Sequence, residues 1–154
     1  MPSNPSALQT AVQLATRERD AAARRLAQAR QGWMAAQMQL DQLESYAQET
    51  LSRWRTQSTR CTPEIMVHHH QFMERLTHAM QLQTGAVAQH AATVKLMADK
   101  LRATETRRES LLQLHTQREN DVRRALDRRE QKASDERAAM QYQRRLAGGM
   151  AGGM

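Results

Sequence analysis

The first third of the chain carries apolar residues at alternating steps of four and three, which is the spacing of one helix of a coiled coil. Twelve of the fourteen positions in this series are apolar, and only Arg19 and Thr50 interrupt it. A pattern sustained for so long predicts a helix over about residues 5–57 that pairs with another helix. The series is Leu8, Val12, Ala15, Arg19, Ala22, Leu26, Ala29, Trp33, Ala36, Leu40, Leu43, Ala47, Thr50 and Trp54.

A strong break follows at about residues 58–62. Thr62 is a suitable helix cap, Pro63 fits a first turn, and Glu64 lies beside the positive helix end. Ser3 or Asn4 caps the first helix in the same way, ahead of Pro5. So short a connection folds the second helix back antiparallel to the first.

The second helix is predicted over about residues 63–146, and its apolar residues repeat every seven positions. This strict series is Met66, Met73, Met80, Val87, Val94 and Leu101. A more polar companion series is His69, Leu76, Gln83, His90, Met97, Thr104 and Leu111. We expect an all-α fold: one domain over residues 1–147, a long two-stranded antiparallel coiled-coil hairpin whose second helix is the longer. Gly148 and Gly149 are expected to end that helix, with residues 148–154 as a disordered tail.

Small residues in the first helix predict a close approach between the two helices. Alanine recurs at positions 15, 22, 29 and 36 of the seam, which favours the lower end of the usual ~8–10 Å spacing. Gly32 and Gly85 each lower helix propensity by about 1 kcal/mol. Making room beside Trp33 is one reason for them, and a flexible joint is the other.

The two predicted helices differ in length, so part of the second has no partner in the first. Antiparallel pairing places Leu8 opposite about residue 113 and leaves residues 116–146 as an overhang of roughly 45 Å. This overhang carries nine basic and six acidic residues. An unpaired helix this polar is marginal in water, which predicts a second binding site or a segment that frays until bound.

A second apolar row lies near the turn on the second helix, formed by Phe72, Leu76, Ala79, Gln83 and Ala86. Two interpretations stay open. Phe72 packs beside Trp54 or Ala47, or the row is an exposed patch for another protein.

Composition narrows the function classes. The net charge of +7 comes from 23 Lys and Arg against 16 Asp and Glu, and the two signs are interspersed. Such a balance is typical of a solvated helix surface. No apolar run approaches the ~20 residues that cross a bilayer, and the first residues lack the pattern of a secretory signal. The single Cys61 fits a reducing compartment, so we expect a cytosolic protein.

Candidate chemistry is sparse. His68, His69 and His70 point about 100° apart on a helix and cannot converge on one metal ion. His70 and Glu74 lie one turn apart, but two ligands make a weak site. No nucleophile motif, phosphate loop or paired-carboxylate pocket is present in the sequence. We therefore expect no catalytic residue, no metal and no cofactor.

Several stretches resemble the FliJ family of flagellar type III protein export, over roughly residues 8–146. They are the opening residues 14–29 (LATRERDAAARRLAQA), the short turn, the row of Phe72, Leu76 and Ala79, and the closing residues 135–139 (DERAA). The resemblance implies a stalk similar to that of rotary ATPases, which docks in the ring of the export ATPase FliI and promotes its hexamer. It also implies contact with the export gate protein FlhA and escort of export chaperones. Such a protein is cytoplasmic and peripheral to the inner membrane only through the export apparatus.

The resemblance also implies site residues. The export-gate surface carries over as Phe72, Leu76, Ala79 and Gln83 on the second helix, with Gln39, Leu43 and Tyr46 on the first. Thr50 stands where the family usually has an aromatic residue, and Gln83 where it tends to have histidine. For the ATPase, charge and position in the overhang favour Arg123, Arg124, Arg128 and Arg129.

Three alternatives stay open from the sequence. The first is that the chain is the equivalent stalk of a virulence type III secretion system, which is similar in fold and role. The second is that the chain binds nucleic acid, since a basic coiled coil can contact phosphates. Acidic residues are mixed with the arginines, however, and no aromatic residues lie between them for base stacking. We therefore expect no nucleic acid as a partner. The third alternative is that two copies of the chain pair with each other through their exposed apolar rows.

Overall fold

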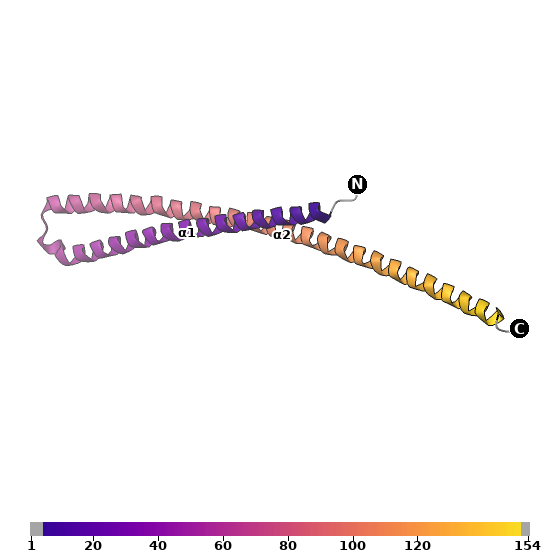
Figure 1. The fold of residues 1–154 in the computed structure, drawn as a ribbon. Helices are drawn as coiled ribbons and strands as arrows, with labels where there is room; N and C mark the ends of the chain where they lie inside the picture. Colours follow the sequence, from indigo (N-terminus) through magenta and orange to yellow (C-terminus); the bar gives the residue numbers. More distant parts are fainter. Residues whose placement is uncertain (1–4, 152–154) are drawn as a thin grey trace. The chain divides into compact units, whose positions relative to one another are not determined.

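The computed structural model describes residues 5–151 and contains two long helices joined by a short turn (Figure 1). Helix α1 spans Pro5–Gln57, the 3-10 helix η1 spans Ser58–Arg60, and helix α2 spans Pro63–Ala151. The helices pack against each other as an antiparallel hairpin, and α2 has 89 residues against 53 in α1. The predicted all-α hairpin with a longer second helix is therefore confirmed. The proposed caps Ser3 and Asn4 lie outside the described residues.

The turn is built by the residues that the sequence singled out. The backbone is extended at Cys61, and α2 then begins at Pro63 with Glu64 in its first turn. The Thr62 hydroxyl accepts a hydrogen bond from the Ile65 N–H at 3.4 Å, and the Thr62 carbonyl accepts one from the Met66 N–H at 3.2 Å. The Thr62 hydroxyl thus satisfies one of the amide donors that a helix start leaves without partners, and its carbonyl accepts the first hydrogen bond of the helix.

The chain divides into two compact units. The hairpin unit comprises Leu14–Arg108, and the terminal unit comprises Met1–Gln13 together with Glu109–Met154. Helix α2 contributes to both. The packing of each unit is described by itself below.

The core of the hairpin unit is a thin seam lined mainly by α1. Its most buried residues include three seam alanines, and Ala15 is only 3% exposed. An alanine side chain is short enough to be covered completely by the larger residues opposite it, whereas those larger residues stay half-exposed at the sides. The buried apolar residues of this unit are Ala15, Ala22, Leu26, Ala36, Leu40 and Leu76. All of them belong either to the four-and-three series of α1 or, for Leu76, to the companion series of α2.

The seam begins later on α2 than the sevenfold repeat indicates. Met66 is 52% exposed, although it opens the predicted series. The first contact across the hairpin is instead a stack of the Trp54 and His69 rings, with centroids 4.0 Å apart and planes 5° apart. In the register of this stack, Met66 lies opposite the polar Gln57 at the end of α1.

Polar contacts replace apolar ones at the far end of the hairpin unit. The Arg108 side chain donates to the Thr16 hydroxyl at 2.9 Å, and Arg107 forms an ion pair with Glu18 at 3.7 Å. Arg19, which interrupts the apolar series, is held by an ion pair of 2.9 Å with the adjacent Asp20. At this end the polar contacts flank the buried alanines Ala15 and Ala22.

The two glycines inside the helices have different surroundings. A Cβ atom at Gly32 would lie 3.1 Å from Nδ1 of His90, whereas one at Gly85 would meet nothing within 4 Å. Gly32 thus makes room for His90 on the opposite helix. No steric need explains Gly85.

In the terminal unit, Leu8 is 7% exposed and is the buried apolar residue of this part. All residues from 121 to 149 are exposed; we call this stretch of α2 the arm. The sequence places the end of the helix near Leu146, whereas α2 continues to Ala151. Gly148 and Gly149 do not take the positive φ of a helix-ending glycine, and glycine weakens a helix without removing a backbone donor as proline does. Residues 152–154 of the predicted tail lie outside the described part.

Candidate protein-binding surfaces

The first candidate surface is the turn-side patch, formed by Gln39, Leu43 and Tyr46 on α1 with Phe72, Leu76, Ala79 and Gln83 on α2. The structure brings aromatic residues of the two helices together here. Tyr46 and Phe72 meet edge to face, with ring centroids 5.9 Å apart and planes at 83°. Tyr46 is 49% exposed and Phe72 is 37% exposed, so both rings keep accessible surface. Phe72 contacts Tyr46, which the resemblance places in the same surface, whereas the packing alternative named Trp54 or Ala47.

Gln83 ties the patch together by hydrogen bonds. Its side-chain amide donates to the Ala36 carbonyl at 2.9 Å and to Oε1 of Gln39 at 3.1 Å. A shallow groove beside it is lined by Gln39, Gln42, Leu43, Tyr46 and Gln83. Gln42 is not among the residues that the sequence predicts for this surface. It lies outside the four-and-three series of α1, so its spacing does not indicate a place in the patch.

The patch residues do not all offer surface to a partner. Leu76 is only 7% exposed, and Ala79 and Leu43 are half-buried. Leu76 belongs to the seam series as well as to the apolar row. Its side chain is therefore buried in the seam, and the aromatic rings with the glutamine amides form the accessible face.

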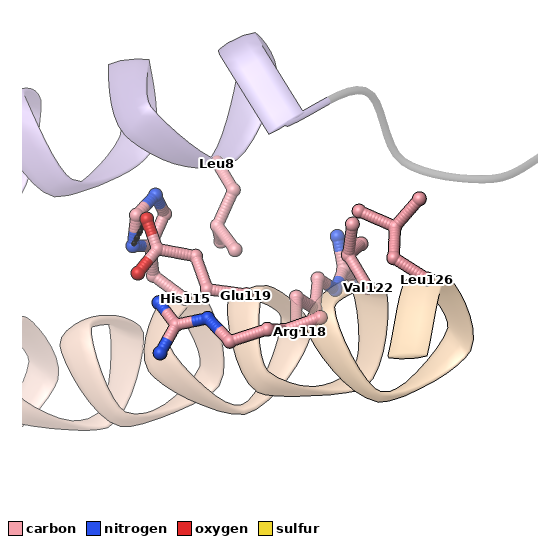
Figure 2. A pocket seen from close by; sticks show the side chains of 7 residues that line it. Leu8, His115, Arg118, Glu119, Val122 and Leu126 are labelled. Atoms are coloured by element: carbon pink, nitrogen blue, oxygen red, sulfur yellow. Dashed lines mark ion pairs between the residues drawn. The ribbon is translucent and has the colours of Figure 1, made fainter. Parts of the chain in front are cut away.

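The second candidate surface is the arm with the groove at its base. Arg123, Arg124, Arg128 and Arg129 are all exposed, as the sequence predicts for this overhang. Figure 2 shows Leu8 pointing from α1 toward α2, with Val122 and Leu126 further along α2. The groove is lined by Leu8, His115, Arg118, Glu119, Val122, Arg123 and Leu126. Of the four arginines, only Arg123 lines it.

The groove contains exposed apolar side chains and also a polar atom without a hydrogen-bond partner. Val122 is 59% exposed and Leu126 is 52% exposed. Nδ1 of His115 lies 3.6 Å from a carboxylate oxygen of Glu119. Nη1 of Arg118 is buried but has no hydrogen-bond acceptor among residues 5–151. Arg118 therefore brings a positive charge and an N–H donor to the groove beside its apolar side chains.

The histidine run forms no metal centre within the described chain. His70 pairs with Glu74 at 3.1 Å, and His69 stacks on Trp54. No group of three or more His, Cys, Asp or Glu residues in the described part is placed to hold a metal ion. Neither described helix combines the length and apolar character that crossing a bilayer requires.

These features define a class of protein: an all-α helical hairpin with exposed apolar and charged side chains along both helices. The sequence matches the family described as Flagellar FliJ protein over residues 4–147. The chain therefore belongs to the FliJ family, a non-catalytic component of the flagellar protein export apparatus. Searches of curated proteins and of solved structures each found no match.

Proposed function

We propose that this chain is the stalk of the export apparatus at the cytoplasmic face of the inner membrane. Its arm docks in the ring of the export ATPase FliI and promotes the hexamer. Its turn-side patch contacts the export gate protein FlhA, and the protein escorts export chaperones. The observation that carries the proposal is the arm, in which every residue from 121 to 149 is exposed.

The arm has the properties of a segment that needs a partner on all sides. A helix without tertiary cover is marginal in water, and a ring lumen surrounds an inserted helix completely. The arm carries eight basic and five acidic residues, so an acidic lumen complements it. The apolar groove at its base and the unmatched Arg118 donor favour a protein partner with both apolar and acceptor groups.

The turn-side patch supports the second contact. It exposes two aromatic rings beside a groove with glutamine amides, and aromatic residues are enriched where interfaces gain most of their energy. Its apolar surface is small, which suits a reversible contact.

The arm is tested by replacing Arg123, Arg124, Arg128 and Arg129 together with glutamine. The matched control replaces four exposed arginines of the hairpin unit with glutamine, and these are Arg24, Arg25, Arg30 and Arg102. The readouts are the stimulation of FliI ATPase activity and the fraction of FliI that sediments as a hexamer. We expect the arm variant to need about tenfold more protein for half-maximal stimulation, and the control to match the unmodified chain.

Equal stimulation by both variants would reject the ATPase contact of these arginines. The same two variants are also assayed for binding of nucleic acid at low and high salt. Salt-sensitive binding that only the arm variant loses, with no effect on FliI, would favour the nucleic-acid alternative instead.

A further inference from the structure

The turn end of the hairpin unit exposes an apolar cluster that neither candidate surface uses. Ile65, Met66 and Val67 are 49%, 52% and 56% exposed. We call these three residues the tip cluster. They lie in the first turns of α2, beside the end of α1 at Gln57.

The direction of these side chains argues against a one-sided partner. Three consecutive residues of a helix are spread over about 200° of its circumference. A groove in another protein covers one face of a helix, so it would leave part of the cluster in water. An environment that surrounds the end of the hairpin covers all three residues at once.

The charge around the tip cluster indicates the chemistry of that environment. Residues 51–70 contain three arginines, Arg53, Arg55 and Arg60, and a single acid, Glu64. All three arginines are exposed. Basic residues that flank exposed apolar ones are typical of segments that bind an anionic lipid surface.

The dimensions of the tip agree with this chemistry. At 1.5 Å per residue, Pro63 to Val67 extends about 6 Å along the helix. Apolar groups of interfacial segments enter the boundary of headgroups and acyl chains by ~5–10 Å. Trp54 stacks on His69 just behind the cluster, and tryptophan is favoured at the interface between lipid and water.

We infer that the tip of the hairpin is a membrane-surface anchor: Ile65, Met66 and Val67 enter the interface of an anionic bilayer while Arg53 and Arg60 contact lipid phosphates. This contact is peripheral and does not span the membrane. It is separate from the ATPase and gate contacts proposed above, and it does not depend on either.

Cys61 provides the direct test, because it is the single cysteine of the chain and lies in the turn. An environment-sensitive fluorophore on Cys61 of the full chain is mixed with vesicles of phosphatidylcholine alone or of equimolar phosphatidylcholine and phosphatidylglycerol. We expect a blue shift and higher emission only with the anionic vesicles. The control carries the same label at Gln81→Cys in a Cys61→Ser background, and its emission is expected to stay unchanged.

Vesicle co-sedimentation separates the tip from the basic arm. Ile65→Ser, Met66→Ser and Val67→Ser are combined in one variant, and the matched control combines Met38→Ser, Leu82→Ser and Leu96→Ser, which are equally exposed apolar positions away from the turn. We expect the tip variant to bind anionic vesicles about tenfold more weakly and the control to bind normally. Circular dichroism checks that both variants keep their helix content.

Three results would overturn the inference. One is an unchanged emission of labelled Cys61 with anionic vesicles. Another is equal sedimentation of the tip variant and its control, with binding lost only when the arm arginines are replaced. The third is that the unmodified chain forms a dimer in sedimentation equilibrium and does not bind vesicles, while the tip variant is a monomer. The cluster would then join two copies of this chain.

Discussion

At the scale of single residues, the seam depends on size more than on polarity. Ala15, Ala22 and Ala36 are among the most buried residues, and larger side chains on α2 such as Val87 and Leu101 remain half-exposed. A seam between two helices has no third layer, so only short side chains are fully covered. This explains why no large side chain in the described part is completely buried.

The two helical glycines lead to a prediction at this scale. Gly85→Ala should stabilise the protein by roughly 0.5–1 kcal/mol, because alanine favours the helix and its Cβ meets open space. Gly32→Ala should gain less, since its Cβ forces His90 to move. Urea unfolding followed by circular dichroism measures both. A lower midpoint for Gly85→Ala than for the unmodified chain would contradict this account.

At the scale of the elements, the length of α2 exceeds what α1 can cover. Leu8 lies beside His115 and Arg118, as the antiparallel pairing predicts to within a turn. Beyond that point α2 continues as the exposed arm. A helix of this kind is held by its own hydrogen bonds and side-chain pairs alone, such as Gln131 with Asp135 at 3.4 Å.

Hydrogen exchange should separate the arm from the hairpin unit. Backbone amides in residues 127–149 are expected to exchange at least about tenfold faster than those in residues 20–45, because opening the arm exposes no buried apolar surface. Mass spectrometry of peptides from the full chain measures both regions in one sample. Equal protection of the two regions would show that the free arm has cover that the structure does not provide.

At the scale of the whole molecule, the turn-side patch exists only because two helices meet. Tyr46 and Phe72 are 26 positions apart in the sequence, yet their rings touch. Gln83 bridges the same helices through the Ala36 carbonyl. Any partner of this patch therefore recognises the folded hairpin and not a linear peptide.

This arrangement predicts that both aromatic rings contribute to the affinity for the export gate protein FlhA. Phe72→Ala and Tyr46→Ala should each weaken binding to purified FlhA by about tenfold, because each removes accessible aromatic surface and the support of the other ring. Surface plasmon resonance with immobilised FlhA measures this effect. Leu82→Ala is the control, since Leu82 is 64% exposed on α2 and outside the patch.

Two outcomes would show that the turn-side patch does not bind FlhA. One is unchanged affinity of both aromatic variants, and the other is an equal loss in the Leu82→Ala control. Helix content and urea midpoints for all three variants distinguish a lost contact from a lost fold. Phe72→Leu adds a further comparison, since leucine keeps the apolar bulk while removing the edge-to-face ring contact.

The sequence by itself determined the helices, the turn and the seam, because these follow from local rules. Heptad spacing places Leu26, Ala36 and Leu40 on one face of a helix in any conformation of the rest. Thr62 and Pro63 mark a helix start by their own chemistry. The family match likewise rests on the order of residues along the chain.

Only the tertiary structure decided which side chains touch and which remain accessible. Met66 has the same sevenfold spacing as Met73, yet it is exposed, because it lies opposite the polar Gln57 at the end of α1. The stack of Trp54 on His69, the fit of His90 against Gly32 and the unmatched Arg118 donor depend on side-chain positions in two helices. Periodicity specifies the face on which a residue lies, but contact and exposure depend on what the other helix places opposite it.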